Sequence, residues 1–170
     1  MTPALAAWRP GVERHNIWEL IVHAAYWKYV AWRRLTGAKR GSFPLAGSNF
    51  LARPVENTKA ALQADLDLLD EMHRVLREAA AAVPAGALDL GSAQRGVTKR
   101  ALLTGVAAHD LYHAGQIQLL KRLERTCRAE ARQREGGMHR QGHITTFVMM
   151  PLGKISSGFI SRCAMPCCTV

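Results

Sequence analysis

Two histidines four residues apart, His109 and His113, are the first candidates for chemistry in this sequence. They lie in the string GVAAHDLYHAGQIQLLKRL, whose apolar residues recur every three or four positions, as in an amphipathic helix. Residues i and i+4 share one helix face, so both imidazoles are expected to point into the protein. One divalent cation would satisfy both buried rings, although two hydrogen-bonded core histidines fit the spacing as well.

A third metal ligand should come from another inward-facing helix, and His23 is the best candidate. It lies between Leu20 and Trp27 on a segment whose face is also apolar. Taken alone, an inward histidine is more often a core residue hydrogen-bonded to a carbonyl. Three imidazoles from facing helices would leave coordination positions open, which is typical of a catalytic metal site. Such a ligand set favours zinc or nickel, and also suits iron or copper.

Gln116 follows His109 by seven residues and returns to the same helix face. It could hydrogen-bond a metal-bound water or orient a ligand, and it is the candidate catalytic residue. It could equally be a polar residue at the end of the apolar stripe. Asp110 and Tyr112 turn away from the face of His109. They could hydrogen-bond the metal ligands, but boundary residues are the favoured interpretation.

Three predicted helices position these side chains. The first covers about residues 16–35, with Asn16 as N-cap and Gly37 as its stop. The second covers about residues 56–82, and the third about residues 98–125, with Thr98 as N-cap. This part of the chain shows no sustained strand-like alternation, so an all-α fold is predicted.

The sequence changes character after the third predicted helix. We expect a helical bundle domain over residues 1–126 and an irregular or disordered tail over residues 127–170, with Gly136 and Gly137 breaking the helix. The four cysteines match neither a zinc ribbon nor a disulfide framework, and are expected to be free thiols in a reducing compartment. They are Cys127, Cys163, Cys167 and Cys168.

The net charge of +10 raises the question of a nucleic-acid partner. The basic residues form short, scattered clusters at predicted helix ends, and no nucleic-acid-binding motif accompanies them. A solvated basic surface is therefore the favoured interpretation. No apolar run reaches the roughly 20 residues that span a bilayer, and the N-terminus lacks the layout of a secretory signal. A cytoplasmic location is predicted.

The strings HNIWELIVHAAYWKYVAWRRLTG and GVAAHDLYHAGQIQLLKRL resemble the DinB-like (DNA-damage-inducible) metalloprotein superfamily, over about residues 8–125. The resemblance implies a four-helix bundle that holds a divalent metal with three histidines, which match His23, His109 and His113. The family has a helix before the segment that begins at Trp8, close to where this sequence starts. We therefore expect an up-down bundle that lacks the first of four helices. Its uncovered apolar face would favour a homodimer.

The resemblance also implies a function. Some relatives are transferases or isomerases that depend on low-molecular-weight thiols such as bacillithiol or mycothiol. The metal would bind the thiol as a nucleophilic thiolate, with a small electrophile near Trp27. Two alternatives stay open: a metal-dependent hydrolase of small molecules, and a stress-related metal-binding bundle without catalysis. The string HDLYH has the spacing of the HExxH protease motif but lacks its glutamate, which disfavours a protease.

Overall fold

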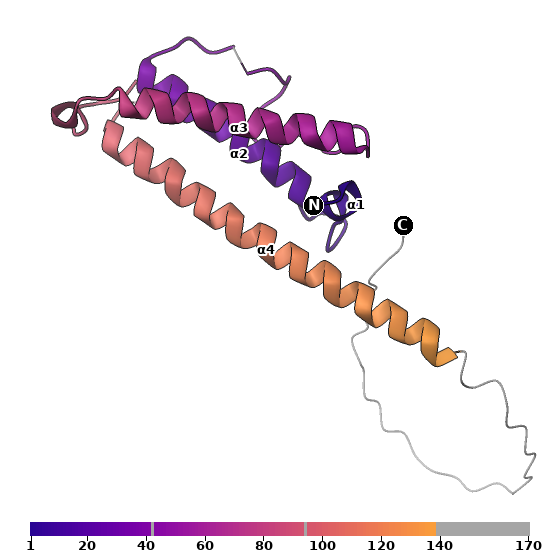
Figure 1. The fold of residues 1–170 in the computed structure, drawn as a ribbon. Helices are drawn as coiled ribbons and strands as arrows, with labels where there is room; N and C mark the ends of the chain where they lie inside the picture. The colour runs from indigo at the N-terminus through magenta and orange to yellow at the C-terminus, as the bar shows by residue number, and fades with distance from the viewer. Residues whose placement is uncertain (42, 94, 139–170) are drawn as a thin grey trace, which may run out of the picture. The chain divides into compact units, whose positions relative to one another are not determined.

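A computed structural model describes residues 1–138 of the chain, except residues 42 and 94. Its helices are α1 (Pro3–Ala7), α2 (Ile17–Thr36), α3 (Lys59–Ala81) and α4 (Lys99–Met138), as Figure 1 shows. A short 3-10 helix, η1 (Ala85–Ala87), precedes α4. Within the described residues no strand occurs, which confirms the all-α prediction. The predicted irregular tail lies outside the described residues from residue 139 onward.

Helix α2 begins and ends where its sequence signals predict. The side chain of Asn16 accepts a hydrogen bond from the Glu19 amide at 2.7 Å, and the Glu19 carboxylate accepts one from the Asn16 amide. This reciprocal capping box satisfies two of the amides that a helix start leaves without partners. Gly37 ends the helix in the left-handed region, with φ of 76°, which glycine adopts without steric cost.

Helices α3 and α4 start at threonine N-caps. The Thr58 hydroxyl accepts from the Ala61 amide, and the Thr98 hydroxyl accepts from the Ala101 amide, both at 3.1 Å. The prediction that α4 ends near residue 125 was wrong, because the helix continues through both glycines to Met138. Residues 127–135 are mostly Ala, Arg, Glu and Gln, whose high helix propensity extends the helix.

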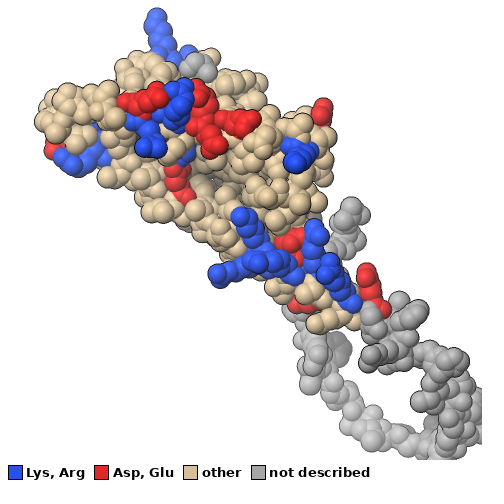
Figure 2. Space-filling model, in the orientation of Figure 1, with Lys and Arg blue, Asp and Glu red and all other residues tan. Residues whose placement is uncertain are grey.

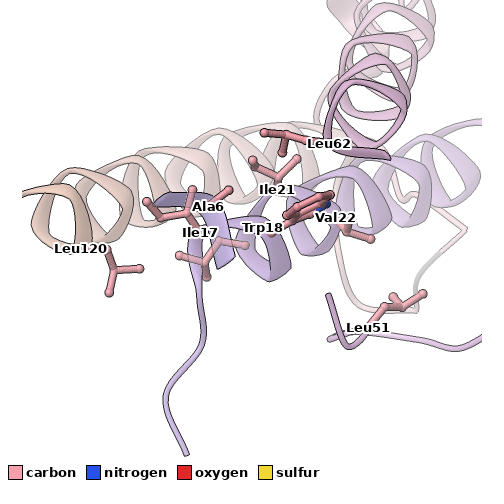
Figure 3. Close-up of a cluster of buried hydrophobic side chains, with 9 residues drawn as sticks. Ala6, Ile17, Trp18, Ile21, Val22, Leu51, Leu62 and Leu120 are labelled. Atoms are coloured by element: carbon pink, nitrogen blue, oxygen red, sulfur yellow. The ribbon is translucent and has the colours of Figure 1, made fainter. Parts of the chain in front are cut away.

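The chain divides into two units, Met1–Glu124 and Arg125–Val170. In the first unit α2 is the central helix, with α3 packed along it and α1 against it. Figure 3 shows the main apolar cluster, in which α2 supplies Ile17, Trp18, Leu20, Ile21 and Val22.

Trp18 of this cluster is fully buried, but its indole N–H is not left without a partner. It donates to Asp65 Oδ2 of α3 at 2.7 Å, and the Arg53 side chain donates to the same oxygen at 2.8 Å. Burying a polar group is costly unless it is hydrogen-bonded, so this network lets the tryptophan pack in the core. It also holds α2 and α3 together.

Helix α1 occupies the place where the resemblance implies a first bundle helix. It has only five residues, and its Ala6 is fully buried in the cluster with α2. On α4 several large apolar side chains are exposed, with Leu111 at 76%, Tyr112 at 63% and Leu119 at 56%. The homodimer expected from such a surface stays a prediction.

Charged side chains of both signs share the surface. On the face shown in Figure 2, basic and acidic residues lie beside each other over α3. Arg74, for example, pairs with Glu71 and Glu78, each at 2.7 Å. In the part of the chain that the structure describes, no helix has both the length and the hydropathy to cross a bilayer.

Glu19 should make the stability of this fold sensitive to acid. Burial pushes its pKa up, but hydrogen bonds from Arg9, His15 and the Arg53 amide outweigh burial and hold the pKa below its ordinary value of 4.5. The stabilisation is therefore complete above pH 4.5 and is lost as the pH falls through the lowered pKa. Glu19→Gln should lower the free energy of unfolding by about 2 kcal/mol at pH 7.

Urea unfolding of both proteins at pH 7 and pH 3.5 measures this effect. The difference between Glu19→Gln and wild type should be smaller at pH 3.5, because Glu19 of the unfolded chain is then mostly protonated. An unchanged difference would show that the Glu19 charge does not contribute.

Candidate metal centre

Helix α2 places His23 in the interior of the first unit. The side chain is 4% exposed, and α2 is buried around it from Ile17 to Ala25. The loop between α2 and α3 covers the ring, since Phe50 stacks on it with ring centroids 3.9 Å apart. His15 stacks on the other face of Phe50, with centroids 3.8 Å apart. The His23 ring thus lies between its own helix, α2, and the loop that follows this helix.

Helix α4 presents His109 and His113 on one face, as the spacing predicts. His113 is 6% exposed, and His109 is half-buried. Their rings lie edge to face, with centroids 4.3 Å apart and planes at 76°. Both rings face His23, whose centroid lies 5.0 Å from that of His109 and 4.7 Å from that of His113.

The three rings turn the same nitrogen toward one point. His109 Nε2 lies 3.1 Å from His23 Nε2 and 3.0 Å from His113 Nε2. Ligand nitrogens of a tetrahedral zinc ion, each about 2.0–2.1 Å from the metal, are about 3.3 Å apart. Two of the three spacings therefore fit a metal ion with little movement, and the ligand atoms of all three residues lie within 4.8 Å of one another, so these residues could hold one.

The contacts of the Nδ1 atoms, which point away from the meeting point of the rings, explain why a cation would be stable between the Nε2 atoms. His23 Nδ1 lies 3.1 Å from the backbone oxygen of Asn49, and His113 Nδ1 lies 2.6 Å from Gln116 Oε1. Both oxygens only accept, so both Nδ1 atoms carry the hydrogen and both Nε2 atoms keep a lone pair. A proton on His109 Nε2 could satisfy one of these lone pairs but not both. A bound cation satisfies all three Nε2 atoms at once.

Burial favours the neutral, metal-binding form of these rings. It lowers the pKa of His23 to about 4, against the opposing effect of the Asn49 carbonyl and with a further contribution from the two other histidines. Burial also lowers the pKa of His109, helped by His113 and opposed by Asp110. Protons therefore compete weakly with a metal for these two rings at neutral pH.

Gln116 lies beside His113, on the side away from the point where the three rings meet. Its amide nitrogen donates to the Tyr112 hydroxyl at 3.1 Å, which fixes its oxygen toward His113 Nδ1. This contact fits the expectation that Gln116 orients a ligand. A catalytic role for Gln116 stays a prediction.

Replacing Gln116 tests which of its roles matters. Gln116→Leu removes the acceptor that fixes the His113 tautomer, so zinc affinity should fall about 10–100-fold. Gln116→Glu keeps an acceptor there and should bind zinc about as tightly as wild type. Competition with a chelating dye measures both affinities. Unchanged affinity in Gln116→Leu would contradict the orienting role.

Two cavities are each lined by two histidines of the triad. One, of about 400 Å³, lies between α2 and α4 and is lined by His23 and His109. The other, of about 590 Å³, is lined by His23, His113 and Gln116, with Tyr112 and Phe50 on its walls. Both volumes suit small molecules. A ligand could therefore approach the three nitrogens from either cavity.

Sequence reasoning missed several neighbours of the site. Asn49 has a positive φ of 62°, and its side chain also accepts from the Trp27 indole at 3.1 Å. The loop that carries Asn49 and Phe50 is long for a tight bundle, and that length is the signal that could have found it. Asp110, expected at the boundary, is paired with the buried Lys28 of α2.

The fold and the site define a class of protein: a helical bundle in which three histidines from two helices could hold a metal ion. The family model of the DinB superfamily matches residues 1–117, and the chain belongs to this superfamily. Comparison with curated proteins gives no significant match, and neither does comparison with solved structures.

Proposed function

We propose that this chain is a metal-dependent enzyme that joins a low-molecular-weight thiol to small electrophiles, or isomerises them with its help. His23, His109 and His113 would hold the metal, with zinc or nickel as the favoured ion. The observation that supports the proposal is the convergence of three histidine Nε2 atoms, with contacts of 3.1 and 3.0 Å. In two of the three rings, those of His23 and His113, the Nδ1 atom is held by an acceptor oxygen.

The chemistry follows from three nitrogen ligands with open positions beside them. A bound divalent metal would lower the pKa of a coordinated thiol, so that its proton is lost to solvent at neutral pH. In a transfer reaction the sulfur forms a bond to the electrophilic carbon, and a leaving group departs with the electron pair of the broken bond. With an epoxide or an activated alkene that pair stays on the substrate and takes up a proton from solvent. The chain's own residues would hold the two reactants in the two cavities beside the triad.

The surroundings of the triad favour a thiol over water as the nucleophile. Hydrolysis at a metal is commonly assisted by a carboxylate or another base near the attacking water. Among the described residues that line the two cavities, Glu13 is the one carboxylate, and it is exposed. A third cavity, lined by His113, has two carboxylates: Asp110, which is paired with Lys28, and Asp70, which is exposed. A thiol that loses its proton on coordination needs no such base.

Two residues would position the reactants rather than react. Gln116 would hold the orientation of His113, and through it the direction of one metal bond. Trp27 would form a wall for the electrophile, since its ring centroid lies 5.8 Å from that of His109. A cytoplasmic location would keep the thiol reduced.

A thiol-consumption assay tests the proposal. Zinc- and nickel-loaded protein would be incubated with a low-molecular-weight thiol and a panel of electrophiles that includes epoxides, alkyl halides and unsaturated acids. We expect metal-dependent loss of thiol with at least one electrophile, and none above background with His113→Ala. Metal-bound wild type that consumes no thiol with any electrophile would overturn the proposal and favour a non-catalytic metal-binding bundle.

A further inference from the structure

The cavity of about 400 Å³ between α2 and α4 indicates which class of substrate could bind beside the triad. Its two polar imidazoles, His23 and His109, line one part of it. The rest of its wall is mostly apolar, with Ala31, Val97, Ala101, Leu102, Gly105 and Val106. Such a cavity binds the apolar part of a ligand and leaves orientation to the few polar groups it contains.

Among the residues that the structure describes, Arg34 is the one charged residue that lines this cavity. It follows His23 by eleven residues on α2, about three helical turns, and so lies on the same face of the helix. Its guanidinium carbon is 5.9 Å from the ring centroid of Trp27. The same indole contacts the triad, with centroid distances of 6.3 Å to His23 and 5.8 Å to His109. One indole ring therefore separates the cation from the candidate metal centre.

The charge of Arg34 has no acidic partner in the part of the chain that the structure describes. Ion pairs in this part of the chain are formed by other basic residues, among them Arg9, Arg53 and Arg74, and Arg34 belongs to none of them. The face of Trp27 attracts a cation but does not neutralise it. A guanidinium beside an apolar cavity is suited to a carboxylate, which it can bind through two parallel hydrogen bonds.

We infer that this cavity binds a carboxylate-bearing substrate with a flat, apolar body. The carboxylate pairs with Arg34, the body lies against Trp27, and the reactive end lies at His23 and His109. This inference rests on the proposed function, because it names the class of electrophile that the same site would take. Arg34 is then a specificity-determining residue, and neutral analogues of the substrate should bind more weakly.

Two naphthalene probes of similar shape test the inference. The quenching of tryptophan fluorescence gives the affinity of zinc-loaded protein for 2-naphthoate and for the neutral 2-naphthylmethanol. Wild type should bind the acid about tenfold more tightly, as a charge-assisted pair implies. Arg34→Met should remove this preference and leave the affinity for the alcohol unchanged, while Arg34→Lys should keep part of it. An equal preference for the acid in Arg34→Met would overturn the inference.

Two glycines of α4 supply a matched pair of variants that locate the probe. A Cβ on Gly105 or on Gly115 would meet no other heavy atom within 4 Å, so both sites accept a side chain. Of the two, Gly105 lines the cavity. Gly105→Leu should weaken both probes at least about tenfold by filling the cavity, since a small-molecule site must stay hollow. Gly115→Leu should leave both affinities unchanged, and equal effects of the two variants would place the probes elsewhere.

The metal-free protein separates this inference from the proposed function. If Arg34 selects the acid, the preference should persist without zinc and in His113→Ala. Preference for the acid without any thiol consumption would support the inference and contradict the proposed function. Metal-dependent thiol consumption that is equally fast with acidic and neutral electrophiles, in wild type and in Arg34→Met, would do the reverse.

Discussion

Replacing His113 by alanine should greatly lower the affinity of the chain for a divalent metal. The variant removes one of three nitrogens that converge within 4.8 Å of one another. Even residues that only orient a metal ligand are worth about 10–100-fold in affinity, so the loss of a ligand should exceed about 100-fold. Competition titration with a chelating dye, with elemental analysis of dialysed protein, measures the effect. Wild type should retain one metal ion per chain, and the variant much less than one.

His73→Ala is the matched control for this variant. His73 is an exposed histidine on α3 and lies outside the triad. The His73→Ala variant should bind zinc as wild type does, and zinc should raise the melting temperature of this variant and of wild type. If His113→Ala and His73→Ala bind metal equally, the triad is not the metal site and the three rings are core residues.

Asp110→Asn should be the most destabilising conservative substitution in the bundle. Asp110 pairs with the ammonium of Lys28, whose side chain is 5% exposed, whereas the Asp110 side chain is 35% exposed. Asparagine would leave the lysine charge buried and unpaired, at an expected cost of about 3–5 kcal/mol in the free energy of unfolding. Urea unfolding at pH 7 measures this cost.

The reverse variant gives the control. Lys28→Met fills the buried space with an apolar chain of similar length. The Asp110 side chain is partly exposed, although its Oδ1 is buried, so the loss of its lysine should cost less than Asp110→Asn, about 1–2 kcal/mol. The double variant should recover most of the stability that Asp110→Asn loses, because no buried charge remains. Equal losses in the two single variants would show that the position of the lysine charge does not decide the cost.

The helix face that carries the candidate metal ligands was predictable because it depends on local periodicity. Four residues separate His109 from His113 in any helix, and the apolar stripe around them shows which way they point. His23 needed only the direction of its own helix face. The helix starts at Asn16 and Thr98 were predictable for the same reason, since a cap contacts residues two or three positions away.

The contacts that complete the site were not predictable, because they join distant parts of the chain. Asn49 reaches His23 from a loop 26 residues away, and it does so with a backbone oxygen that has no sequence signature. Lys28 and Asp110 are 82 residues apart, and each is typical of a helix surface. Nothing local indicates that α4 would bury the lysine.

X-ray absorption at the zinc edge of the loaded protein would identify the atoms bound to the ion. We expect three imidazole nitrogens at about 2.0–2.1 Å from the zinc, with oxygen from solvent as the remaining ligand. In His113→Ala, scattering from one imidazole should disappear. A spectrum dominated by sulfur, or one with the same imidazole scattering in the variant as in wild type, would contradict a metal centre built from His23, His109 and His113.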